Sequence, residues 1–282
     1  MQKVWRLARI LSLDVVLGAV ASGSLAAYWL KQPMPWIWWL ALPLSVWVIY
    51  TTDHLLDAYR LKERASTPRH AFHYQYFRPL LLLWGLGLLS CLTWIPWQAP
   101  REMWLLGFIM GGLVLAHLGL VYWVGDRISW LFIKELGVGS IYAAGVWGGP
   151  LVFAWPDWPT GTLGLFAQFW LMALINLLFF SLYERHIDEQ DGHSSFVRAI
   201  GPQRARQLIG LLVLLVLVLG LTLCLDESAA SVLLLKVQAV YLLMLSLLSA
   251  VSFAENRFRP QERYRIWGDA AFLLPALVWL FA

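Results

Sequence analysis

Long apolar stretches separated by short polar segments run through the whole chain. Most of them extend over about 20 residues, the length at which a helix rising 1.5 Å per residue crosses the roughly 30 Å hydrocarbon core of a bilayer. The pattern predicts an all-α protein, with a single transmembrane domain over residues 1–282. Apolar windows bounded by Pro, Gly and charge place nine membrane-spanning helices at residues 8–30, 35–56, 78–97, 102–124, 130–154, 162–183, 207–225, 229–253 and 266–282.

Composition supports a membrane protein and leaves no room for a second, soluble domain. Hydrophobic residues make up 60% of the 282 residues and charged residues only 13%, whereas soluble domains carry about 25% charged residues. The two cysteines, Cys91 and Cys224, have neither metal-ligand spacing nor the density of a disulfide scaffold. The two cysteines therefore give no information about function.

The distribution of positive charge predicts the orientation of the chain. With the N-terminus in the cytoplasm, all but three of the 21 Lys and Arg residues lie at cytoplasmic ends of the predicted spans; the exceptions are Lys31, Arg101 and Lys236. This asymmetry follows the positive-inside rule. It predicts a protein of the bacterial inner membrane whose C-terminus is exterior. Nucleic acid is not an expected partner, because the basic residues flank apolar spans instead of alternating with exposed aromatic residues.

The polar end of the second predicted span carries a first candidate site. Asp53 and Asp57 are four residues apart, so on a helix both carboxylates project from one face. Like charges at this spacing repel unless a cation or basic side chain compensates, and Arg60 and Arg64 continue the same row. The spacing is compatible with a cation site and also with a surface ladder of ion pairs.

A second acidic cluster follows the sixth predicted span. Asn176 lies within that apolar stretch, and Glu184, Asp188 and Asp191 come after it. Carboxylates from two cytoplasmic segments beside arginines suit Mg²⁺, which proteins bind through one or two carboxylates and substrate phosphate oxygens. The two clusters together predict a site for a diphosphate whose polyprenyl tail lies in the bilayer.

These features resemble the UbiA-type intramembrane prenyltransferase superfamily over almost the whole chain. Its members have nine transmembrane helices and two cytoplasmic aspartate motifs, one after helix two and one after helix six. The segment Asp188-Glu-Gln-Asp191-Gly-His-Ser-Ser, with its continuation to Ala205, resembles the second motif. Residues 130–150, with a basic start and a glycine-rich body, resemble the fifth helix.

The resemblance implies an enzyme that transfers a polyprenyl group from its diphosphate to an aromatic or lipid-like acceptor, with Mg²⁺ as cofactor. The allylic C–O bond would ionise, pyrophosphate would leave, and the acceptor would attack the carbocation. The expected catalytic residues and Mg²⁺ ligands are Asp53, Asp57, Asp188 and Asp191. The residues expected to bind substrate are Arg60, Arg64, Arg69, Lys134, Asn176 and Glu184.

The first motif departs from the family pattern NDxxDxxxD. When Asp53 and Asp57 occupy the last two positions, Ile49 and Tyr50 stand where the family has Asn and Asp. Two alternatives therefore stay open. One is a UbiA-type terpene cyclase, in which the ionised prenyl chain closes on itself. The other is a lipid-binding or structural subunit of a membrane complex that no longer catalyses a reaction.

Several further polar residues fall inside predicted spans, where hydrocarbon makes them costly. We expect them to face the interior of the bundle, a cavity or one another. Lys134 is the best functional candidate among them, because it lies near the cytoplasmic end of the glycine-rich fifth span, although pairing with its neighbours is an alternative. The others are Asp14, His117, Glu135, Asn176, Lys236 and Asp269.

Overall fold

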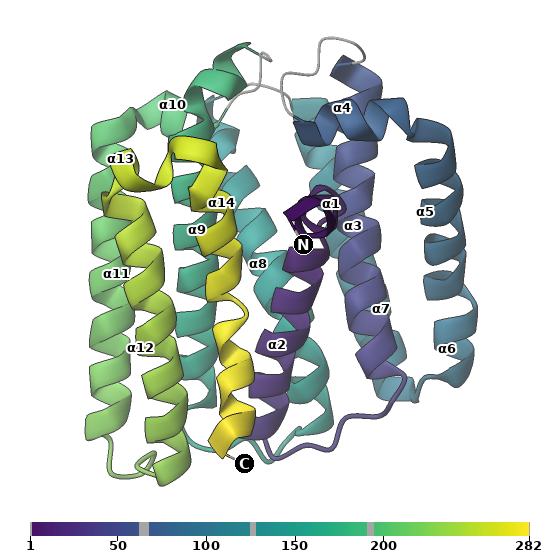
Figure 1. The fold of residues 1–282 in the computed structure, drawn as a ribbon. Helices are drawn as coiled ribbons and strands as arrows, with labels where there is room; N and C mark the ends of the chain where they lie inside the picture. The colour runs from purple at the N-terminus through teal and green to yellow at the C-terminus, as the bar shows by residue number, and fades with distance from the viewer. Residues whose placement is uncertain (1, 62–67, 125–127, 191–194, 282) are drawn as a thin grey trace.

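The computed structural model describes residues 2–61, 68–124, 128–190 and 195–281, which form only helices and their connections (Figure 1). In chain order the elements are α1 (Gln2–Ile10), α2 (Leu13–Trp29), α3 (Trp38–Leu61), α4 (Pro68–Gln75), α5 (Phe77–Leu92), α6 (Trp94–Gln98), α7 (Arg101–Val124), α8 (Ile128–Phe153), α9 (Thr162–Gln190), α10 (Phe196–Ile200), α11 (Pro202–Leu225), α12 (Val232–Phe253), α13 (Glu255–Phe258), the 3-10 turn η2 (Pro260–Glu262), α14 (Arg263–Ala271) and the 3-10 segment η3 (Leu274–Phe281).

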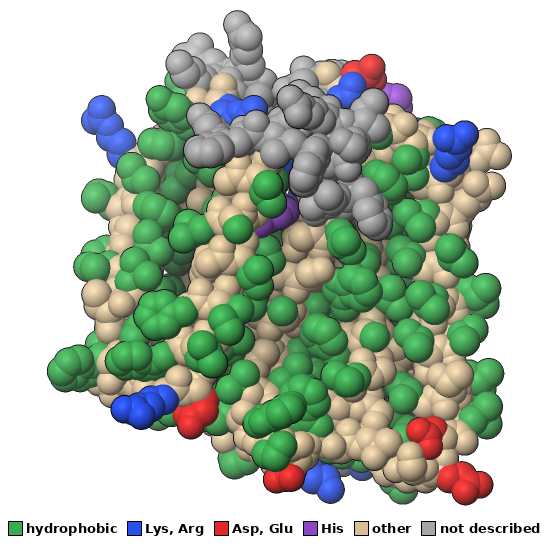
Figure 2. All heavy atoms as spheres, turned by 180° about the vertical axis from the view of Figure 1, so that it is seen from behind, with side chains coloured by type: hydrophobic (Ala, Val, Ile, Leu, Met, Phe, Trp, Pro, Cys, Tyr) green, Lys and Arg blue, Asp and Glu red, His purple; other side chains and the backbone are tan. Residues whose placement is uncertain are grey.

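The structure is an all-α bundle suited to a membrane. Within the described ranges, six helical segments are long and apolar enough to cross a bilayer: Phe77–Gln98, Arg101–Val121, Lys134–Phe153, Thr162–His186, Pro202–Leu225 and Val232–Phe253. Helix α2 is also apolar but has only 17 residues. Figure 2 shows hydrophobic side chains over the height of the helices and places Lys, Arg, Asp and Glu at the two ends. Such a surface is expected where lipid is the solvent.

Helix α9 lies at the centre of the bundle. It packs against α8 on one side and α11 and α12 on the other, while α2 packs against α3, α8 and η3. Over half of the apolar window of α9 is buried (56%), whereas that of α7 has no buried residue. The core accordingly gathers around α9, with Phe169, Met172 and Phe179 fully enclosed.

Helix α1 separates from α2 within the stretch that the hydrophobic pattern predicts as one span, residues 8–30. The helix breaks at Ser12, which adopts a left-handed conformation with φ of 56°. This conformation costs a residue other than glycine about 1–3 kcal/mol and persists only where its surroundings hold it. The buried Ser12 hydroxyl lies 3.1 Å from His54 Nε2, so a contact from α3 fixes the break.

The last predicted span, residues 266–282, is also interrupted. Helix α14 ends at Ala271, and the chain continues as the 3-10 segment η3. Pro275 has no N–H to donate to the carbonyl of Ala271, so the α-helical hydrogen-bond pattern stops there. By contrast, α3 and α9 continue beyond their predicted ends. Asp57 therefore lies on the same helix as Asp53, as the i, i+4 spacing predicted, and Asp188, which follows the predicted sixth span, also lies on a helix.

The glycines of α8 allow neighbouring helices to approach closely, as small residues do in membrane bundles. A Cβ atom at Gly149 would overlap the indole ring of Trp38 at the start of α3. Gly145, on the same helix, has only an ordinary contact, 3.6 Å from Met110 Cε. Gly149 is thus a packing position for which glycine is required.

We expect Gly149→Ala to lower the free energy of unfolding by about 1–3 kcal/mol, because the added methyl must displace a fully buried Trp38. Thermal unfolding in detergent micelles measures the effect. Gly145→Ala is the matched control and should change stability by less than half as much. Equal stability of the two variants would contradict the packing role.

Candidate functional site

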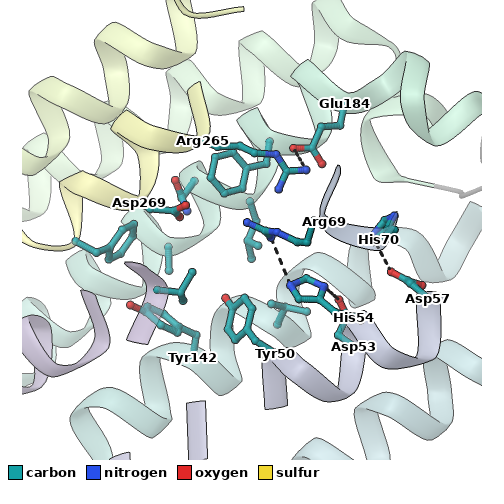
Figure 3. Close-up of a pocket in the computed structure, with 18 residues that line it drawn as sticks. Tyr50, Asp53, His54, Asp57, Arg69, His70, Tyr142, Glu184, Arg265 and Asp269 are labelled. Carbon is teal, nitrogen blue, oxygen red and sulfur yellow. Dashed lines mark hydrogen bonds and ion pairs between the residues drawn. The ribbon is translucent and has the colours of Figure 1, made fainter. Parts of the chain in front are cut away.

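A cavity of about 260 Å³ opens between the helices at the end of the bundle where α3 and α9 terminate (Figure 3). Six helices and the turn after α14 contribute to its wall. The lining residues are Val15 from α2; Tyr50, Asp53, His54 and Asp57 from α3; Arg69 and His70 from α4; Val138, Gly139 and Tyr142 from α8; Ala173, Asn176, Leu177, Phe180 and Glu184 from α9; and Arg265, Asp269 and Phe272 from the C-terminal segment.

One wall of the cavity is acidic and comes from α3. Asp53 and Asp57 are one helical turn apart and both line the cavity. The Asp53 carboxylate is 64% exposed and lies 3.9 Å from His54 Nδ1, while Asp57 is 20% exposed and lies 3.5 Å from His70 Nε2. Both carboxylates are thus open to the cavity, and each has a histidine beside it.

Arg69 of α4 enters the middle of the cavity (Figure 3). Its guanidinium donates to the carbonyl of Arg9 at 3.2 Å and lies 3.5 Å from His54 Nε2. Burial and the positive charge of nearby Arg265 both lower the pKa of Arg69. The two guanidiniums therefore repel each other, and the carboxylates of Asp269, Asp14 and Glu184 offset part of that repulsion. An anionic ligand between the guanidiniums would lower it further.

Arg265 of α14 is the second cation of the cavity. Its Nη2 lies 2.8 Å from Glu184 Oε1 of α9, which ties the C-terminal segment to the central helix. The guanidinium also stands over the rings of Phe180 and Tyr264, at 6.0 and 5.9 Å from their centres. Carboxylate and rings together hold this guanidinium in one position at the cavity wall.

The deeper part of the cavity combines aromatic rings with buried polar groups. Tyr50, Tyr142, Phe180 and Phe272 supply the rings. The Asn176 side-chain oxygen is buried and has no hydrogen-bond partner among the described residues. A buried acceptor of this kind is costly unless a ligand or water satisfies it, so the inner cavity is suited to a ligand that donates a hydrogen bond.

Five of the residues predicted from the sequence line this one cavity: Asp53, Asp57, Arg69, Asn176 and Glu184. Arg60 is exposed on α3 and Lys134 lies at the start of the α8 span, and neither lines the cavity. Arg64 and Asp191 lie outside the described residues. Asp188 belongs to α9, but its side chain is not among those described. The structure therefore brings together the first acidic motif and half of the expected substrate contacts.

Several residues of the site were not predicted from the sequence. His54 and His70 stood beside the acidic motif but were not singled out, and Arg265 was only counted as a basic residue. Asp269 was expected to face the bundle interior, and it lines the cavity with 9% of its surface exposed. Arg265 and Asp269 are four residues apart at the start of an apolar span. That is the spacing shared by Asp53 and Asp57, and it was the available signal.

The carboxylates of the cavity fit Mg²⁺ only if a bound phosphate-bearing molecule supplies further oxygen ligands. Across the described parts of the chain, no three His, Cys, Asp or Glu side chains converge to hold a metal by themselves. Asp53 and Asp57 nevertheless offer hard oxygen donors on one face, and Mg²⁺ commonly takes one or two carboxylates and completes its shell with water and phosphate. The residues present therefore fit a cation that arrives with, or waits for, a phosphate-bearing substrate.

Comparison with known proteins gives no family for this chain. No protein-family model matches it, and no curated protein matches it significantly. The geometry of the cavity is therefore the basis for any functional assignment.

Proposed function

We propose that this protein is a Mg²⁺-dependent intramembrane prenyltransferase of the UbiA type, which transfers a polyprenyl group from its diphosphate to an aromatic or lipid-like acceptor. The observation that carries the proposal is a single cavity that unites the two carboxylates of α3 with two partly buried arginines and an aromatic interior. The cavity lies at one end of a bundle of apolar helices that are suited to a membrane. At that position an amphiphilic substrate can place its charged head in water and its apolar tail in the bilayer.

In this proposal each wall of the cavity has its own role. Asp53 and Asp57, together with Asp188 and Asp191 of the second motif, would hold Mg²⁺. The bound ion would supply positive charge that stabilises the leaving pyrophosphate. Arg69 and Arg265 bind the diphosphate oxygens, because guanidinium groups match phosphate geometry and remain charged when buried.

The inner cavity would then serve the reacting carbon and the acceptor. The rings of Tyr142 and Phe272 would shield an allylic cation there, an interaction worth about 2 kcal/mol per ring in a dehydrated site. Asn176 offers its unpaired oxygen to a hydroxyl or amine of the acceptor. Exclusion of water from this part would favour transfer over hydrolysis.

We further propose nine membrane crossings. Helices α2 and α3 and the broken segment from α14 through η3 add three to the six long apolar spans. An odd number places the ends of the chain on opposite sides, with the N-terminus and the cavity mouth in the cytoplasm and the C-terminus outside a bacterial inner membrane. The charge asymmetry along the sequence supports this orientation.

Pyrophosphate release tests the proposal. Purified protein in nanodiscs is incubated with prenyl diphosphates of several chain lengths, with a mixture of candidate acceptors, and with either Mg²⁺ or EDTA. We expect release only with Mg²⁺, and its loss in Asp53→Ala and in Asp188→Ala. Full activity in either variant, or no release by the wild type with any prenyl chain, would overturn the assignment.

One alternative has a specific observation in its favour. Tyr50, which lines the cavity, stands where the first motif usually has an aspartate, so the site has fewer carboxylates than a typical member. A protein that binds prenyl diphosphate without turning it over is the second candidate. Binding of inorganic pyrophosphate by calorimetry, without any product from prenyl diphosphate, would distinguish it from the enzyme.

A further inference from the structure

A second arginine cluster lies at the same end of the bundle, outside the cavity. Arg185 of α9, Arg206 of α11 and Arg259, which follows α13, all pair with the carboxylate of Glu255. The Arg185–Glu255 distance is 3.1 Å. None of these four residues lines the cavity described above. We call them the Glu255 cluster.

The Glu255 cluster carries surplus positive charge. Burial acts to raise the pKa of Glu255, but the hydrogen bonds and charges of the three arginines prevail and lower it to about 2. The carboxylate is therefore always ionised near neutral pH, and it compensates one of three positive charges. The surrounding segments add the exposed Arg204, Arg257 and Arg263, and also the acidic side chains of Glu189 and Glu262.

Holding the helices together does not require this surplus, because one arginine per carboxylate would satisfy the ion pair. Arg206 and Arg259 keep 43% and 42% of their side chains exposed. Each guanidinium has five N–H donors in a fixed fork, so donors remain after the bonds to Glu255. Guanidinium groups arranged in this way match a phosphate monoanion, which can accept from two of them at once.

The surroundings of the cluster indicate where such a phosphate would come from. Arg206 lies in the second turn of α11, the most apolar of the six spans, and exposed leucines, among them Leu211, Leu214 and Leu217, follow one to three turns further along. Phe253, two residues before Glu255, is 53% exposed and faces Gly210 of α11, whose Cβ position is 3.8 Å from the ring. The cluster thus stands directly above apolar faces of α11 and α12 that lipid chains would cover.

We propose that the Glu255 cluster binds the headgroup phosphate of an anionic phospholipid, whose acyl chains lie against Phe253 and the exposed leucines of α11. The chemistry that recognises it is charge complementarity at the level of the headgroups, joined to an apolar contact within the bilayer. This site is separate from the proposed prenyl diphosphate cavity and does not depend on it.

Lipid titration of delipidated full-length protein in detergent tests the site. Phosphatidylglycerol, phosphatidylcholine and inorganic phosphate are added separately. Thermal unfolding and native mass spectrometry then report stabilisation and retained lipid. We expect phosphatidylglycerol to stabilise the wild type, with at least about a 10-fold weaker apparent affinity in Arg206→Gln/Arg259→Gln. The control Arg6→Gln/Arg78→Gln removes the same charge from exposed arginines elsewhere and should keep wild-type affinity.

Three results would overturn the site. They are wild-type affinity in the cluster variant, an equal loss in the control, or equal stabilisation of the wild type by inorganic phosphate or phosphatidylcholine. If the double Gln variant does not fold, Arg206→Lys/Arg259→Lys is tested in its place. This variant keeps the two positive charges beside Glu255 and removes the guanidinium groups. A loss of affinity in that variant supports the site, and unchanged affinity argues against it.

Discussion

Asp57→Asn is expected to lower Mg²⁺-dependent release of pyrophosphate from a prenyl diphosphate by about 100-fold or more. The substitution keeps the size of the side chain and removes a negative charge from the acidic wall formed by Asp53 and Asp57. A metal-bound diphosphate is stabilised by several kcal/mol in such a site, and each 1.36 kcal/mol corresponds to a factor of about 10 in rate. Steady-state assays over a Mg²⁺ titration measure the loss.

The Mg²⁺ titration also separates a ligand from a structural residue. If Asp57 is a ligand, the Mg²⁺ concentration for half-maximal rate rises in Asp57→Asn, and high Mg²⁺ restores part of the activity. Asp226→Asn is the matched control, because Asp226 is exposed in the α11–α12 connection at the opposite end of the bundle. A lower rate in Asp57→Asn with an unchanged Mg²⁺ dependence would argue against the metal role.

Arg265→Gln should reduce kcat/KM for the prenyl diphosphate by about 100-fold, as removal of a charge that stabilises a leaving anion typically does. Arg265 is one of two arginines of the cavity, and the Glu184 carboxylate and two aromatic rings hold its guanidinium in position. Arg263→Gln is the control, because that arginine is exposed on the same helix.

A double variant distinguishes two explanations of that loss. Arg265 could act only by neutralising Glu184, 2.8 Å away. In that case Arg265→Gln/Glu184→Gln should recover most of the activity, because no uncompensated carboxylate is left in the cavity. If Arg265 contacts the diphosphate, the double variant stays as impaired as Arg265→Gln. Recovery in the double variant would therefore remove Arg265 from the substrate contacts.

Hydrophobic patterning predicted the helices well because a bilayer leaves the chain few choices. Backbone groups in hydrocarbon must be paired within a helix, so any sufficiently long apolar stretch becomes one. The stretches predicted at 102–124, 130–154 and 229–253 correspond closely to α7, α8 and α12. The pattern failed at two positions within apolar stretches. At Ser12 a left-handed backbone conformation interrupts the helix, and at Pro275 the missing N–H does so.

For the candidate site, the sequence singled out residues near the ends of two helices but did not define their partners. Asp53 and Asp57 were recognisable because i, i+4 spacing is a local property of one helix. Arg265 and Glu184 are 81 positions apart in the chain, and only the packing of α14 against α9 brings them to 2.8 Å. The apolar surface of the bundle, its helical segments and the acidic face of α3 therefore follow from the sequence by itself. The tertiary structure decided which polar side chains share one cavity, because long-range packing, and not local periodicity, determines which helix ends meet.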